Sequence, residues 1–193
     1  MTDYFALLGE PRRPWLDEDE LKSKFFALST SVHPDRAHSL PKKEKKAAHE
    51  RYTELNAAYN CLREPKERLR HLVELCRGTK AAHVQQVPST LVEIFFEIGK
   101  VCREADEFLK RKASVTSPLL LVNLFEEGQA LSERLMNLRQ DVASRQEQFV
   151  AELKQLNGNW EQNLDRLQEI QQTLSYLHRW SAQLQERIVQ LSF

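Results

Sequence analysis

The chain has 193 residues, of which 41% are hydrophobic and 29% charged, and its 28 Lys and Arg balance 28 Asp and Glu. A net charge of zero gives no global reason to expect nucleic-acid or membrane binding, and the length fits one or two domains. The opening MTDYFALLGEP lacks the basic region and long apolar core of a secretory signal. No run approaches the roughly 18 apolar residues of a membrane span, and three cysteines without a C-x-x-C pair indicate a reducing compartment. We therefore expect a cytoplasmic protein.

The first elements form a helical pattern that a proline interrupts. Residues 3–8 predict a short apolar helix that ends at Gly9. Asp17 then begins a second helix, because its carboxylate can accept hydrogen bonds from the free amides of the first turn. Pro34 disfavours helical geometry at His33, so a turn begins there. The apolar stripe of this second helix is predicted to comprise Leu21, Phe25, Leu28 and Val32.

The third helix is predicted to start after Pro41 and to run to about Leu62, so that it pairs with the second helix as an antiparallel hairpin. Pro65 opens one more short helix, which Gly78 ends. Residues 78–88 are small and polar without periodicity and predict a linker. The chain up to residue 77 therefore predicts one small helical unit.

Three long helical patterns follow the linker. The first begins at Ser89 as a candidate cap, the second at Ser117-Pro118 and extends to about Leu156, and the third runs from Trp160 to the end after the break at 157–159. The first is predicted to turn Leu91, Phe95, Ile98, Ala105 and Phe108 inward. The predicted fold is all-α, with a helical hairpin unit at 1–77, a linker at 78–88 and a three-helix bundle at 89–193.

Histidines around the turn suggest a metal or catalytic site, but the pattern does not support one. His33, Asp35, His38 and His49 show none of the spacings of known metal sites, and the chain has no glycine-rich phosphate loop. We expect no enzyme and no cofactor. A metal-dependent hydrolase remains the rival interpretation from another class, and it predicts stoichiometric metal in the purified protein.

The N-terminal unit resembles a J-domain. The resemblance rests on DYFALLG in the first helix, HPD after the second and LNAAYNCL in the third, over about 70 residues. It implies that His33, Pro34 and Asp35 form the loop with which J-proteins stimulate ATP hydrolysis by a DnaK/HscA-type chaperone. It also implies a basic docking surface, for which the chain offers Lys22, Lys24 and Arg36. Pro34 lowers the cost of ordering such a loop on binding.

The resemblance extends to the HscB family of J-proteins. DYFALLGEP, PKERLRHLVEL, the chain length and the closing TLSYLHRWSAQLQERIVQL are similar to that family. It implies two partners, an HscA-type chaperone and an IscU-type iron–sulfur scaffold protein that the C-terminal bundle delivers. The client-binding positions it implies are Leu91, Val92, Glu93, Phe95, Glu97 and Tyr176.

The client surface departs from the family pattern, and two interpretations stay open. Ile94-Phe95-Phe96 replaces the expected alternation of apolar and acidic residues, and Gly99 stands where a glutamate is usual. Leu91 and Phe95 could equally be core residues, whereas so many adjacent apolar residues cannot all face one side of a helix. The alternative function is a J-domain adaptor whose bundle binds a different partner that is not an iron–sulfur protein.

Overall fold

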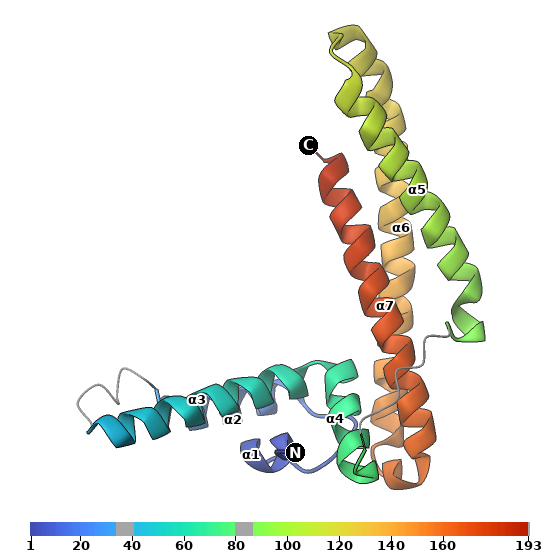
Figure 1. Cartoon of the computed structure of the whole chain (residues 1–193). Helices are drawn as coiled ribbons and strands as arrows, with labels where there is room; N and C mark the ends of the chain where they lie inside the picture. The colour runs from blue at the N-terminus through green and yellow to red at the C-terminus, as the bar shows by residue number, and fades with distance from the viewer. Residues whose placement is uncertain (34–40, 80–86, 193) are drawn as a thin grey trace. The chain divides into compact units, whose positions relative to one another are not determined.

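The computed structural model describes residues 1–33, 41–79 and 87–192, and every regular element within these ranges is a helix (Figure 1). The predicted all-α fold is confirmed. The α-helices are α1 (Tyr4–Leu8), α2 (Glu18–Ser31), α3 (Lys42–Arg63), α4 (Pro65–Arg77), α5 (Val92–Ser114), α6 (Pro118–Leu156) and α7 (Leu164–Leu191). Short 3-10 turns at Ser89–Leu91 and Trp160–Asn163 precede α5 and α7.

Side chains and glycines set the helix ends as the sequence predicts. The Asp17 carboxylate accepts hydrogen bonds of 3.0 Å from the backbone N–H groups of Asp19 and Glu20, which caps α2. Gly9 and Gly78 end α1 and α4 with φ of 66° and 69°, a left-handed conformation that favours glycine. Ser89 is not the predicted cap, because it begins the 3-10 turn and no side chain bonds the start of α5.

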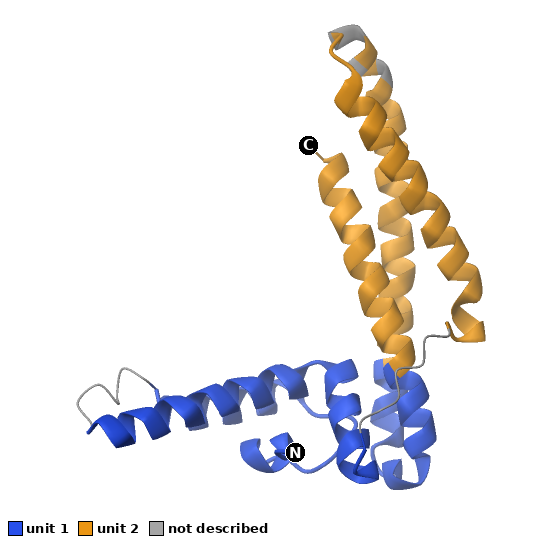
Figure 2. Ribbon diagram, in the orientation of Figure 1, with its two compact units in different colours: residues 1–83, 150–171 blue, residues 84–149, 172–193 orange. Residues whose placement is uncertain are grey.

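The chain divides into two compact units (Figure 2). Unit 1 contains residues 1–83 and 150–171, and unit 2 contains residues 84–149 and 172–193. Both α6 and α7 therefore contribute residues to each unit. The predicted segments 1–77, 78–88 and 89–193 stay a prediction, and most of the proposed linker lies outside the described residues.

Unit 1 has its core where α2 and α3 pack side by side against α1 and α4. On α2 the buried positions are Leu21, Phe25 and Ser29, spaced four residues apart. The predicted stripe was wrong at its end, because Leu28 and Val32 are only half-buried. The aliphatic and aromatic core residues of the unit's first part are Phe5, Leu8, Leu16, Leu21, Phe25, Leu55, Ala58, Leu62, Leu69, Leu72 and Val73.

A buried arginine connects three segments of unit 1. Arg68 on α4 is 2% exposed, and its Nε donates to the carbonyl oxygen of Pro14 at 2.8 Å. Its Nη1 donates to the carbonyl oxygen of Leu62, at the end of α3, at 2.7 Å. The side chain thus satisfies two backbone acceptors that no helix satisfies. Burial lowers the pKa of Arg68 to about 10, so the guanidinium is charged at neutral pH.

Unit 2 is a bundle of α5 and most of α6 and α7. Its core contains Ile94 where the sequence predicted Phe95, and Phe95 lies 40% exposed. The buried residues of the cluster are Leu91, Ile94, Ile98, Val101, Cys102, Ala105, Leu135, Leu138, Val142, Leu177, Trp180 and Leu184. Within this unit the α5–α6 hairpin extends past the end of α7 (Figure 1). The exposed Leu120, Val122 and Phe125 lie near the start of α6.

Candidate functional site

The first candidate surface lies at the end of α2, where His33 follows the helix. The α2 helix ends at Ser31, and the N–H of its cap residue Val32 donates to the carbonyl oxygen of Ser29 at 3.2 Å. The His33 ring is half-buried and meets the Tyr52 ring of α3 edge-on, with 5.4 Å between ring centres. Pro34, Asp35 and Arg36 lie outside the described residues. His33 therefore lies where the end of α2 packs against α3.

A groove opens beside His33 between α2 and α3. Its volume is about 490 Å³, and its lining residues are Phe25, Phe26, Ser29, Thr30, His33, Tyr52 and Asn56. Phe26 is 54% exposed, although it is a large apolar residue. The sequence analysis missed this groove, and the adjacent pair Phe25-Phe26 was the signal for it. One helix side can bury only one of two adjacent phenylalanines.

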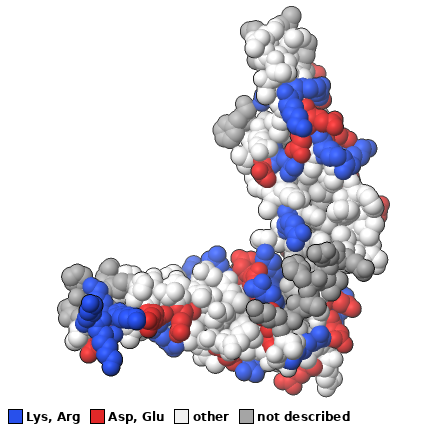
Figure 3. All heavy atoms as spheres, viewed as in Figure 1, with Lys and Arg blue, Asp and Glu red and all other residues white. Residues whose placement is uncertain are grey.

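The predicted basic residues of this surface differ in what they contact. Lys22 is exposed on α2, whereas Lys24 forms an ion pair of 2.9 Å with Glu10, whose side chain is only 5% exposed. Lys24 therefore also helps to hold α2 against the segment that follows α1. A group of exposed lysines lies at the start of α3, at the end of unit 1 (Figure 3). These are Lys42, Lys43, Lys45 and Lys46.

The second candidate surface is a cluster of aromatic rings in unit 2, which we call the aromatic face and define by Phe95, Phe96, Tyr176 and Trp180. Phe95 of α5 lies 5.9 Å from the nearly buried Trp180 of α7 and 5.4 Å from Phe96, between ring centres. Tyr176 lies 5.8 Å from Trp180. Phe96 is 68% exposed. Phe95 and Phe96 thus expose aromatic surface beside the half-buried Tyr176 and the buried Trp180, which makes this face a candidate binding surface.

The predicted client-binding residues divide between this face and the core. Val92 is 38% exposed, and Glu93 and Glu97 are exposed beside it on α5. Leu91 is 1% exposed within the core cluster, so its side chain is not accessible to a partner in this structure. The sequence analysis singled out Phe95 and Tyr176 but not Trp180, whose ring packs beside both of their rings.

The histidine-based metal site finds no geometric support in the described part of the chain. In residues 1–33, 41–79 and 87–192, no group of three His, Cys, Asp or Glu side chains could hold a metal ion. His33 and His49 belong to these ranges, whereas Asp35 and His38 do not. Within the same ranges, no helix combines the length and apolar character needed to cross a lipid bilayer.

Comparison with known proteins finds similar sequences. Residues 3–71, which contain α1 to α3 and much of α4, match the DnaJ domain. The chain is 41% identical over 80 residues to a co-chaperone protein HscB homolog of Azoarcus sp. and 35% identical over 88 residues to that of Aromatoleum aromaticum. These matches cover 42% and 46% of the chain, and the chain spans only 45% and 50% of those two relatives.

Two solved structures resemble the whole chain. Chaperone HscB from Vibrio cholerae matches with a TM-score of 0.64 at 20% identity, over 98% of this chain and 99% of that protein. Human co-chaperone protein HscB matches with a TM-score of 0.62 at 21% identity, over 98% of this chain and 81% of that protein. At such identities the likeness shows the fold alone, and the DnaJ match concerns residues 3–71.

Proposed function

We propose that the chain is a co-chaperone of the HscB type that stimulates the ATPase of an HscA/DnaK-type chaperone through His33, Pro34 and Asp35. The observation that supports this most is the DnaJ match over residues 3–71, which includes this motif. Lys22, Lys24 and Arg36 would contribute positive charge to the same contact. The chain itself would perform no chemistry, and the reducing cytoplasm stays the predicted compartment.

The second half of the proposal is client delivery. The aromatic face, together with Val92, Glu93 and Glu97, would bind an iron–sulfur scaffold protein of the IscU type. Exposed aromatic rings around a nearly buried Trp180 give large contact area at little entropic cost. Holding client and chaperone on one chain raises the effective concentration of one at the other, which requires no catalysis.

A single-turnover ATPase assay tests the first half. The assay uses an HscA-type chaperone preloaded with ATP and compares the wild-type protein with His33→Gln, after circular dichroism has shown that both fold. We expect stimulation of about tenfold or more by the wild type, and its loss in the variant. Equal stimulation by both proteins would reject the assignment of the motif.

Binding of an IscU-type scaffold, measured by calorimetry, tests the second half. Phe96→Ser should weaken binding about tenfold or more, because an exposed aromatic contact is lost. Phe125→Ser is the matched control, since Phe125 is 69% exposed against 68% for Phe96 and lies on α6. If the scaffold does not bind the wild type, the bundle serves another partner and the adaptor alternative replaces client delivery.

A further inference from the structure

The start of α6 is apolar and exposed. The helix begins PLLLVNLF, a segment without a charged residue. Leu120, Val122 and Phe125 are 51%, 66% and 69% exposed. The unbonded amides at a helix N-terminus favour acidic side chains, and α2 has three of them in its first turn, whereas α6 has none. Large apolar side chains gathered in water at one place indicate a surface that a partner covers.

These side chains are exposed on more than one side of α6. Leu120 and Val122 are two residues apart, so they lie about 160° apart around the helix axis, and Val122 and Phe125 lie about 60° apart. A partner helix packs against one side of a helix and would leave either Leu120 or Val122 in water. A lipid bilayer surrounds a helix end that enters its interface, so it can cover all three side chains.

The start of α6 is also accessible within unit 2. The α5–α6 hairpin extends past the end of α7, so α7 does not cover this part of the hairpin (Figure 1). A hollow of about 410 Å³ opens where α7 ends. Its apolar side chains are Phe108, Leu124, Phe125 and Leu191, and Lys112 is one of four polar side chains that also line it. Such a mixed lining suits the boundary between lipid headgroups and acyl chains.

Basic residues lie next to this apolar segment. Lys110 is exposed near the end of α5, and Arg111 and Lys112 belong to its last turn. The sequence from 108 to 125 contains these three basic residues and no acidic one. Arg111 pairs with Glu127, whereas Lys110 and Lys112 form no ion pair with any residue that the structure describes. Two ammonium groups are therefore available to an anionic partner.

The acidic residues lie further from the connection between α5 and α6. Glu107, Glu126 and Glu127 are about 10–14 Å along their helices from the ends that meet there, whereas Lys112 is only about 3 Å away. In Figure 3 the charged side chains of this hairpin accordingly form a band below an end that shows no charge. Positive charge thus lies closest to the apolar side chains, which complements an anionic lipid surface.

We infer that the end of the α5–α6 hairpin, which we define by Leu120, Val122, Phe125, Lys110 and Lys112, binds the surface of an anionic lipid bilayer. The three apolar side chains enter the boundary between headgroups and acyl chains, and the two ammonium groups contact lipid phosphates. The contact is peripheral, because no helix in the described ranges could cross the bilayer. It requires nothing of the J-domain, so it stands or falls separately from the proposed co-chaperone function.

Co-sedimentation with vesicles tests the inference. The vesicles contain phosphatidylcholine alone, or phosphatidylcholine with about one third phosphatidylglycerol. The wild type should bind the anionic vesicles about tenfold or more tightly than the neutral ones, and about 0.4 M KCl should weaken this binding. Phe125→Ser should weaken it about tenfold, because an aromatic ring no longer leaves water. Phe96→Ser is the matched control, since Phe96 is equally exposed at the other end of α5, and it should bind like the wild type.

A second variant tests the charges. Replacing Lys110 and Lys112 together by Gln should weaken binding to the anionic vesicles about tenfold or more and leave binding to the neutral ones unchanged. Circular dichroism shows that each variant folds, and ATPase stimulation without vesicles should be the same for all of them. A folded wild type that sediments with neither vesicle overturns the inference, as does Phe125→Ser binding like the wild type. Self-association that Phe125→Ser abolishes, without vesicle binding, would assign the hairpin end to a second copy of the chain instead.

Discussion

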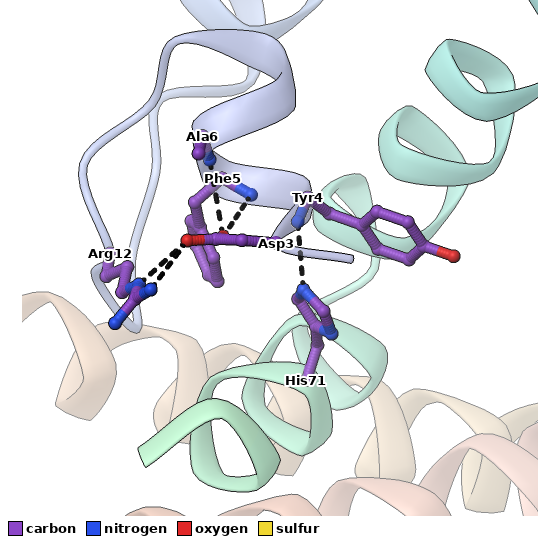
Figure 4. A network of polar contacts seen from close by, with 6 residues as sticks. All are labelled: Asp3, Tyr4, Phe5, Ala6, Arg12 and His71. Atoms are coloured by element: carbon purple, nitrogen blue, oxygen red, sulfur yellow. Dashed lines mark hydrogen bonds and ion pairs between the residues drawn. The ribbon is translucent and has the colours of Figure 1, made fainter. Parts of the chain in front are cut away.

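The backbone N–H of Tyr4 donates a 3.1 Å hydrogen bond to Nε2 of His71, which lies 67 residues further along the chain (Figure 4). The His71 ring also stacks on the rings of Tyr4 and Phe5, with 4.6 Å and 5.9 Å between ring centres. Tyr4 is the first residue of α1, so His71 satisfies an amide that the helix cannot. An imidazole accepts at Nε2 only when it is neutral. The attachment of α1 to α4 therefore depends on the protonation of one histidine.

The first prediction is that unit 1 loses stability as the pH falls below about 6.5. Burial lowers the pKa of His71 from its ordinary value of 6.5, although the nearby Asp3 and Glu74 act to raise it and Arg70 and Arg12 to lower it. The unfolded chain then binds the proton more readily than the folded one. The contribution is full above the unfolded pKa of about 6.5 and is lost as the pH falls toward the folded pKa.

Thermal unfolding at pH 7.5 and at pH 5.5 measures this effect. His71→Gln is the control, because a glutamine oxygen can accept the same hydrogen bond without titrating. We expect the melting temperature of the wild type to fall more over this interval than that of the variant. Burial acts to raise the pKa of Asp3, but the hydrogen bond and charge of Arg12 and the hydrogen bonds from the backbone N–H groups of Ala6 and Phe5 together hold it below its usual range, so Asp3 titrates outside the interval. Parallel curves for both proteins would contradict the prediction.

The second prediction concerns Arg68. Arg68→Met should reduce the free energy of unfolding by about 2–3 kcal/mol, because the carbonyl oxygens of Pro14 and Leu62 lose their donors in a buried site. Arg68→Lys should lie between the wild type and Arg68→Met, since an ammonium cannot reproduce the divergent donors of a guanidinium. Urea denaturation followed by circular dichroism gives the three values. An unchanged midpoint in Arg68→Met would show that the two carbonyl groups find water.

The third prediction separates packing from binding at the start of α5 and in the 3-10 turn before it. Leu91→Ala should cost about 2–4 kcal/mol of stability, because Leu91 is 1% exposed and its removal leaves a cavity in the core cluster. Phe96→Ser should change stability by less than about 1 kcal/mol, since the Phe96 side chain is largely in water. Guanidinium denaturation of both variants makes the comparison. Weak scaffold binding by Leu91→Ala would then report a damaged fold, unless the variant proves as stable as the wild type.

The fourth prediction is a stabilising substitution. Gly99 lies inside α5, and an added Cβ would meet only the end of the Arg103 side chain, at an ordinary contact distance of 3.6 Å. Gly99→Ala should therefore raise the free energy of unfolding by about 0.5–1 kcal/mol, because alanine restricts the unfolded chain and favours the helix. Differential scanning calorimetry would show a higher melting temperature. A lower one would indicate that α5 needs flexibility at this position.

The helices and their ends could be predicted because local chemistry decides them. Asp17, Gly78 and Pro65 act on the amides and carbonyls of their own turns, and the structure places all three at helix ends as predicted. The side that each helix buries was harder to predict. In α5, Ile94 and Phe95 both fit an apolar stripe, and only packing against α6 and α7 selects Ile94. On α2, Ser29 is buried, and its hydroxyl is satisfied by a hydrogen bond to the carbonyl oxygen of Phe26 in the same helix.

The candidate surfaces were only partly predictable for the same reason. The motif around His33 is local in sequence, so it could be recognised directly. The groove needs Tyr52 and Asn56 from another helix, and the aromatic face needs Trp180 from a helix some 85 residues away from Phe95. The burial of Arg68 and His71 contradicts the usual preference of charged and titratable residues for the surface. Contacts with residues distant in sequence decide whether these side chains are buried. The periodicity of a single helix gives no information about such contacts.

Unit 1 is assembled from residues 1–83 and 150–171, which has a consequence for the order in which the newborn protein can fold. The backbone N–H of Trp15 donates to the Asn157 side chain, the ammonium of Lys154 lies over the Trp15 ring, and Arg77 pairs with Asp165. These late partners leave the ribosome on the order of ten seconds after the J-domain sequence, at about 5–20 residues per second. Until then the side of the J-domain around Trp15 and Arg77 stays uncovered. We therefore expect a nascent chain stalled before residue 150 to be cleaved by protease at this side, and a completed chain to resist.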